Sequence, residues 1–161
     1  MNKISSEIVE QTWQSMCTMP TEELPKMVEQ LTNEQPVILA YLMAVGDDFF
    51  NQDERELLLY LGIVIWKIMS QGNMPLPEVS EEQLDEIEDS NIKMLEYLED
   101  ESNTDFITTV ALLIDDYNQP EVLKYVVEAL MEDSEEEYDI RDENTGIIMI
   151  YLKTVIDCFD R

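Results

Sequence analysis

Apolar residues along this chain recur every three to four positions, the spacing that places side chains on one face of an α-helix. The pattern predicts eight helices, over about residues 4–18, 22–31, 34–45, 53–71, 81–100, 105–117, 119–132 and 144–159. No run of residues bounded by turn signals alternates strictly between apolar and polar positions, so no strand is expected. The sequence therefore predicts an all-α protein, a single compact domain of about eight helices over residues 1–161.

Several predicted helices begin after a residue whose side chain can accept hydrogen bonds from the free N–H groups of the first turn. The predicted N-caps are Ser5 or Ser6, Thr21, Asn33 and Ser80. Glu82 and Gln83 lie near the position of the reciprocal partner that a capping box at Ser80 would use. Gly46 is expected to end the third helix, because glycine tolerates the left-handed conformation common at helix C-termini.

The helix predicted over 53–71 is apolar nearly all round, which is typical of a helix at the centre of a domain. Gly62 lies in its middle, where glycine costs about 1 kcal/mol relative to alanine, and a close helix crossing would explain it. Trp13 and Cys17 fall on the apolar side of the first helix and Cys158 on that of the last, so both cysteines are expected to be small core residues. The other residues expected to be buried are Leu39, Leu42, Leu58, Leu61, Ile65, Ile148 and Leu152.

One short pattern occurs twice. Gln35-Pro36-x-x-Leu39-x-Tyr41 recurs as Gln119-Pro120-x-x-Leu123-x-Tyr125, an offset of 84 residues, and at the same offset Gly62-Ile63 meets Gly146-Ile147. A duplication would divide the chain into two similar four-helix halves, 1–72 and 80–161, joined by a connector at 73–79. Prolines near helix starts and leucine stripes also recur for physical reasons alone, so the repeat is one of two interpretations.

The chain is strongly acidic. It has 37 acidic and 9 basic residues and no histidine, a formal net charge of −28. Nucleic acids and anionic membranes are polyanions that such a surface repels, so neither is expected as a partner, whereas a basic protein surface would be attracted. Two interpretations are open: a solvated shell that serves solubility or life at high salt, and an acidic face that binds a partner.

The acids concentrate in two stretches, 81–101 and 132–143, the second of which includes a predicted acidic loop at 133–143. Each stretch is either solvated surface or a docking surface for a basic protein, such as a nucleic-acid-binding enzyme or a toxin. A tyrosine exposed among acids would support an interface anchor. The candidate partner-binding residues are Glu96, Tyr97, Glu99 and Asp100 in the first stretch and Glu135, Glu136, Glu137, Tyr138 and Asp139 in the second.

The sequence carries little sign of catalytic chemistry. The absence of histidine removes the commonest general base and most zinc sites, and four glycines leave no phosphate-binding loop. We therefore predict no catalytic, metal or cofactor site and no enzyme activity. Two alternatives stay open: a carboxylate-based enzyme or divalent-metal binder, since acids are abundant, and a structural protein that forms homo-oligomers.

The ends of the chain and its cysteines bear on location. The N-terminal segment is polar and lacks the apolar core of a signal peptide, and the longest apolar run, Leu57 to Trp66, is too short to span a bilayer. The only two cysteines are far apart in sequence, which favours a reduced compartment. The expected protein is thus cytoplasmic and non-catalytic, and it interacts with or regulates another protein through acidic helical surface.

Overall fold

The computed structural model of the chain describes residues 1–100, 114–136 and 139–160. Over these residues the chain forms seven helices and no strand, which confirms the all-α prediction. The predicted sixth helix falls mainly on residues 105–113, outside the described ranges. The helices are α1 (Ser6–Thr18), α2 (Glu23–Glu34), α3 (Pro36–Ala44), α4 (Gln52–Met69), α5 (Glu81–Asp100), α7 (Pro120–Glu136) and α8 (Asp142–Phe159).

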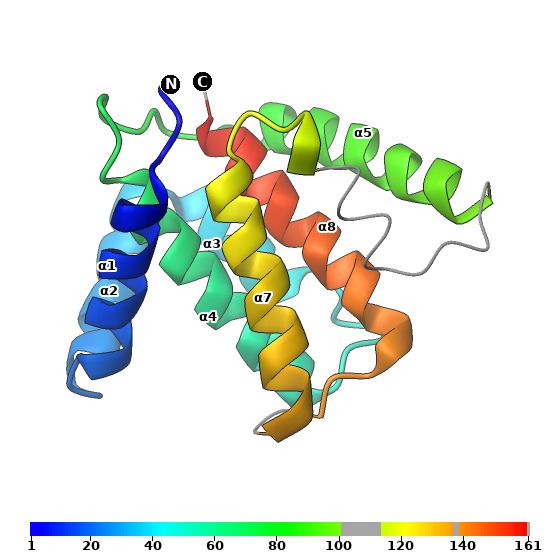
Figure 1. Cartoon of the computed structure of the whole chain (residues 1–161), viewed down its shortest axis with the longest axis horizontal. Helices are drawn as coiled ribbons and strands as arrows, with labels where there is room; N and C mark the ends of the chain where they lie inside the picture. Colours follow the sequence, from blue (N-terminus) through cyan, green and yellow to red (C-terminus); the bar gives the residue numbers. More distant parts are fainter. Residues whose placement is uncertain (101–113, 137–138, 161) are drawn as a thin grey trace.

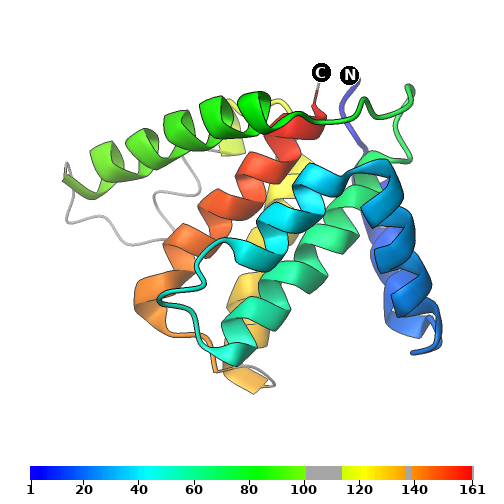
Figure 2. The same cartoon turned by 180° about the vertical axis from the view of Figure 1, so that it is seen from behind.

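Two helices, α4 and α8, form the centre of the fold (Figure 1). They pack against each other and run in the same direction, while α3 and α7 run the opposite way beside them (Figure 2). The α1–α2 pair covers α4, and α5 lies across α8. Both central helices are apolar on nearly every side, so each must be covered on several faces, and the outer helices supply that cover. None of the helices in the described ranges combines the length and apolarity needed to cross a membrane.

The predicted core is confirmed. All seven residues expected to be buried are at most 8% exposed. Gly62 lies where α4 crosses α3: a Cβ placed on it would come within 2.5 Å of a Leu42 methyl carbon. The close helix crossing expected from this glycine is therefore present. Gly46 ends the α3 region with a positive φ of 77°, as glycine permits.

The orientation predicted for the first helix is wrong in part. Trp13 is 39% exposed and the thiol of Cys17 is also exposed, whereas Val9 and Met16 are the buried residues of α1. The reason is that α1 sits at the edge of the fold and, among the described helices, packs mainly on α4 and α7, so its apolar side is covered only in part. Cys158, by contrast, is fully buried, as predicted.

Two of the predicted N-caps are correct and two are wrong. Ser5 and Ser80 accept hydrogen bonds from the first turns of α1 and α5, and Gln83 returns a bond to the Ser80 N–H, which completes the capping box. Thr21 makes no side-chain cap, because α2 begins at Glu23 after Glu22. Asn33 lies inside α2, which continues to Glu34.

The segment predicted as an acidic loop, 133–143, is helical at both of its ends, over 133–136 and 142–143. The structure extends α7 to Glu136 and begins α8 at Asp142. Glutamate has a high helix propensity and no glycine or proline interrupts 121–145, so α7 continues through the acids. The connection between α7 and α8 is therefore shorter than expected.

Two buried glutamines, Gln35 and Gln119, bind the backbone of distant extended segments in the same way. Gln35, just before α3, donates to the Pro77 carbonyl (2.8 Å) and accepts from the Val79 N–H (2.9 Å). Gln119, just before α7, donates to the carbonyl of Asn2 (3.1 Å) and accepts from the N–H of Ile4 (2.9 Å). Each glutamine thus fastens the extended segment that leads into a helix of the other half of the chain.

The correspondence between halves differs from the predicted one at the central helices. Both α4 and α8 have 18 residues, but Gly62 lies in the middle of α4 and Gly146 near the start of α8. The two glycines therefore do not hold the same place in their helices. The burial patterns of the two helices agree instead at an offset of 90, at which Glu54 corresponds to Asn144.

Candidate functional site

The outer surface of α5 carries a row of exposed carboxylates. Asp85, Asp89 and Glu96 follow one another at spacings of four and seven residues, which places them on one side of the helix. Lys93 is the only basic residue of α5, and its ammonium pairs with Asp89 at 2.8 Å. We use the name α5 acidic face for the exposed acids Glu81, Glu82, Asp85, Glu86, Asp89 and Glu96.

The opposite side of α5 is fixed to α8 by a buried polar network. Asn91, only 5% exposed, donates to Thr154 Oγ1 and to Asp157 Oδ2, both at 3.0 Å. Its side-chain oxygen accepts from Lys153 Nζ at 2.8 Å, and Lys153 also pairs with Asp157 at 2.8 Å. Because buried polar groups are costly to leave unpaired, this network fixes the rotation of α5 on α8.

Tyr117 completes the network from the segment before α7. Its hydroxyl donates to Asp157 Oδ1, and the Lys153 ammonium lies 5.0 Å from the centroid of its ring. Burial and the neighbouring Asp157 carboxylate raise the pKa of Tyr117 above its usual value. The tyrosine stays protonated at neutral pH, and its hydrogen bond holds the segment before α7 against α8.

The structure places the predicted partner-binding residues in two separate regions. Glu96 is exposed on the α5 acidic face, and Tyr97, Glu99 and Asp100 lie in the last turn of α5, with side chains outside the described set. Glu135 and Glu136 end α7, and Asp139 is exposed in the α7–α8 connection. Glu137 and Tyr138 lie outside the described residues. The far ends of α5 and α7 lie apart in both views (Figures 1 and 2).

One buried carboxylate was not predicted from the sequence. Glu54, at the start of α4, is fully buried and forms a capping box with Asn51. Arg141 donates to it from Nη2 at 2.7 Å and from Nε at 3.2 Å, and Asn144 donates to both of its oxygens, at 3.1 and 2.9 Å. The same Arg141 Nη2 also donates to the Phe49 carbonyl.

This cluster joins the starts of the two central helices. Burial alone would raise the pKa of the Glu54 carboxyl, but its hydrogen bonds, led by those from Arg141, hold that pKa below its usual value. Glu54 is therefore ionised at neutral pH and fully bonded, which suits a structural role. The sequence Asn51-x-x-Glu54 was the local signal that could have identified this glutamate, because it forms a capping box with asparagine at the N-cap. Nothing in the sequence pointed to Arg141, which is 87 residues away.

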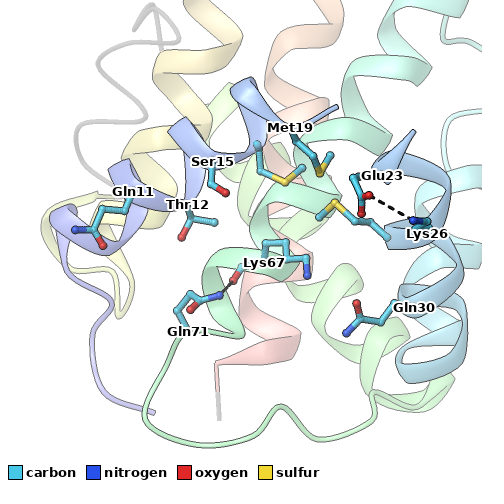
Figure 3. Close-up of a pocket in the computed structure, with 11 residues that line it drawn as sticks. Gln11, Thr12, Ser15, Met19, Glu23, Lys26, Gln30, Lys67 and Gln71 are labelled. Atoms are coloured by element: carbon cyan, nitrogen blue, oxygen red, sulfur yellow. Dashed lines mark hydrogen bonds and ion pairs between the residues drawn. The ribbon is translucent and has the colours of Figure 1, made fainter. Parts of the chain in front are cut away.

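A groove lies between α1, α2 and α4 (Figure 3). A hollow of about 520 Å³ lies between these helices, and an adjoining hollow of about 450 Å³ lies between α2, α4 and the connector around Pro75. The two hollows share Gln30, Lys67 and Gln71. In the larger one the Lys67 side chain points into the open space, opposite Gln30.

Charge is divided unevenly between the parts of the chain. Residues 1–80 contain 12 acidic and 4 basic residues, a net charge of −8, and residues 81–161 contain 25 and 5, a net charge of −20. The α5 acidic face thus belongs to the more acidic half, and the groove to the less acidic one. Within the described residues, no group of three or more cysteine, aspartate or glutamate side chains is arranged to hold a metal ion.

Comparison of the chain with protein-family models, with curated proteins and with solved structures finds no significant match.

Proposed function

We propose that this protein is a non-catalytic binding protein that docks a basic surface of another protein against the α5 acidic face. The observation that carries the proposal is the row of exposed carboxylates on α5, a helix whose sequence contains one basic residue, Lys93. A helix of 20 residues is about 30 Å long, enough to span much of a standard protein interface.

The way α5 is attached supports this proposal. Leu84 and Asn91 are buried on its inner side, and the bonds of Asn91 to α8 prevent the helix from rotating. The carboxylates are therefore held in a fixed arrangement before any partner arrives. Such preorganisation reduces the entropy lost on binding.

Electrostatics favours a basic partner kinetically. A surface of one sign steers a partner of the opposite sign, raises the association rate and makes that rate fall with ionic strength. With a net charge of −20 over residues 81–161, the long-range field of this half is strongly negative. Individual exposed ion pairs contribute little to affinity, so the effect is expected mainly in the association rate and its dependence on salt.

The test compares two variants with equal charge changes. The first neutralises the face with Asp85→Asn, Glu86→Gln, Asp89→Asn and Glu96→Gln. The control neutralises four exposed acids near α1 and α2 with Glu7→Gln, Glu10→Gln, Glu22→Gln and Glu29→Gln. Each protein is used for affinity purification from its native cells at low and high salt, followed by mass spectrometry.

The parent and the control are expected to retain the same basic proteins at low salt, and the α5 variant is expected to lose them. High salt should release them from the parent and the control, since it screens exposed charges. If all three proteins capture the same set in the same amounts, the face is only solvated surface and the proposal is wrong.

The second acidic stretch is tested separately. Reversing Glu135, Glu136 and Glu137 to lysine should leave folding intact, because like charges there repel and cations suit the C-terminal end of a helix. Loss of the captured proteins from this variant would extend the docking surface to the end of α7. Unchanged capture would confine it to α5.

A further inference from the structure

The groove between α1, α2 and α4 offers different chemistry from the rest of the surface. Its larger hollow is lined by three methionines and by polar side chains from all three helices (Figure 3). Of its charged residues, Glu23 and Lys26 pair with each other at 3.4 Å, which leaves Lys67 as the surplus charge. A chain with a net charge of −28 thus has a hollow whose lining carries a net charge of +1.

Lys67 has no carboxylate partner in the part of the chain that the structure describes. Its ammonium lies 4.8 Å from the centroid of the Trp66 ring, and Figure 3 shows it pointing into the hollow. A cation over an aromatic ring keeps its capacity to bind an anion, because the ring face makes no hydrogen bond of the kind a carboxylate makes. Lys67 is therefore placed to receive one anionic group.

In the second half of the chain, the residues that correspond to Met16 and Lys67 bond to each other. Counted from the N-cap serines of α1 and α5, Met16 holds the position of Asn91. Counted from the ends of α4 and α8, Lys67 holds the position of Asp157. Asn91 and Asp157 bond to each other and close the space between their helices. In the first half, the Met16 thioether and the Lys67 ammonium hold these positions and line an open groove.

The glutamines of the groove supply hydrogen-bond acceptors. Gln30 turns its amide N–H group to Glu34 (3.1 Å), and Gln71 turns its own to the Lys67 carbonyl (3.3 Å). Their side-chain oxygens are thereby left for donors such as peptide N–H groups. The chain already uses glutamine oxygens in this way, since Gln35 and Gln119 each accept from a backbone N–H of an extended segment.

We propose that this groove binds a short extended peptide by its free C-terminal carboxylate. The carboxylate pairs with Lys67, and backbone N–H groups of the peptide donate to Gln30 and Gln71. An apolar side chain of the peptide packs on the methionines of the hollow, Met16, Met19 and Met27. A volume of about 520 Å³ lies within the range of sites for ligands of this size. A single surplus cation suits one carboxylate and disfavours ligands with several negative charges, such as nucleotides.

The probe is a pool of tetrapeptides that end in leucine with a free carboxylate, and the same pool amidated at that end is the matched control. Binding is followed by NMR on the full chain carrying ¹³C-labelled methionine methyl groups. The free-carboxylate pool should shift the methyl signals of Met16, Met19 and Met27 in a saturable way. The signals of three exposed methionines outside the hollow, Met43, Met74 and Met131, should stay in place.

Amidation of the pool, or Lys67→Gln, should weaken binding by about tenfold or more, because each removes the charge-assisted bond. Lys124→Gln, at an exposed position on α7, should leave binding unchanged, and circular dichroism checks that both variants are folded. The proposal is overturned if none of the three groove methyl signals shifts, or if the amidated pool binds as well as the free one. It is also overturned if octanoate binds as tightly as the peptides, since the peptide backbone is then not recognised.

Discussion

Glu54→Gln removes the charge at the contact between the starts of α4 and α8. The carboxylate is fully buried and bonded to Arg141, to Asn144 and to the Asn51 N–H at 2.9 Å. Removing one partner of a buried ion pair costs about 3–5 kcal/mol, and a hydrogen bond to a charged group contributes about 1.5–3 kcal/mol. The Arg141 side chain is 41% exposed, so water replaces part of the lost interaction. We therefore expect the free energy of unfolding to fall by about 2–4 kcal/mol, less than the full cost of breaking a buried ion pair.

The assay is urea denaturation followed by circular dichroism, with Glu56→Gln, an exposed change on the same helix, as the control. The pKa of Glu54 is lowered by folding, so its contribution to stability is complete above the ordinary glutamate pKa of about 4.3 and disappears as the pH falls through the folded-state value. The difference between parent and Glu54→Gln should therefore shrink in acid. Comparison at equal pH cancels most of the effect of protonating other acids.

Two results would refute this reasoning. A loss below about 1 kcal/mol at neutral pH would mean that the bonds to Glu54 contribute little beyond those of a neutral amide. A loss of the expected size that does not change with pH would mean that packing, rather than the charge of Glu54, sets the effect.

Three further predictions concern packing and buried hydroxyl groups. Gly62→Ala should destabilise the protein by about 1–3 kcal/mol despite the better helix propensity of alanine, because the new Cβ meets the Leu42 side chain. Urea denaturation measures this loss. A double-mutant cycle with Leu42→Ala should be non-additive, because the two side chains share one contact. Tyr41→Phe should be neutral or stabilising, since the buried Tyr41 hydroxyl has no hydrogen-bond partner among the described residues, whereas Tyr117→Phe should cost about 1–3 kcal/mol through the lost bond to Asp157. The raised pKa of Tyr117 means that its stabilisation holds below the ordinary tyrosine pKa of about 10 and is lost at higher pH, so denaturation above that pH should reduce the gap between parent and Tyr117→Phe.

The features that sequence predicted well are those set by neighbouring residues. The start of α5 follows from Ser80 and Gln83, which bond to each other's backbone three residues apart. The burial of α4 follows from its lack of any polar side. Gly62 indicated a close crossing because few other causes keep glycine within a helix.

The features that sequence predicted poorly depend on distant partners. Periodicity shows that α1 has an apolar side, but not how much of that side another helix covers, so Trp13 and Cys17 were placed inside. The start of α3 was predicted wrongly because α2 continues to Glu34. The Gln35 side chain at the N-cap position makes no cap bond but accepts from the Val79 N–H, 44 residues away.

In the candidate site, too, local features could be predicted and contacts between distant residues could not. The acids of α5 could be identified from composition and helical spacing, and Glu96 is exposed as a docking residue must be. The attachment that fixes the α5 acidic face could not be identified, because Asn91 reaches partners 63 and 66 residues away. An asparagine within an apolar stripe was the available signal, since such a residue must find partners when it is buried.

The most direct test of the proposed function is to locate the contact on a captured partner. A carbodiimide joins carboxylates to lysine amines that touch them, and mass spectrometry identifies the linked residues. If the partner docks on the α5 acidic face, its lysines should be linked to Asp85, Asp89 or Glu96. Links confined to acids elsewhere, such as Glu7, Glu10 and Glu29 on α1 and α2, would contradict the proposal.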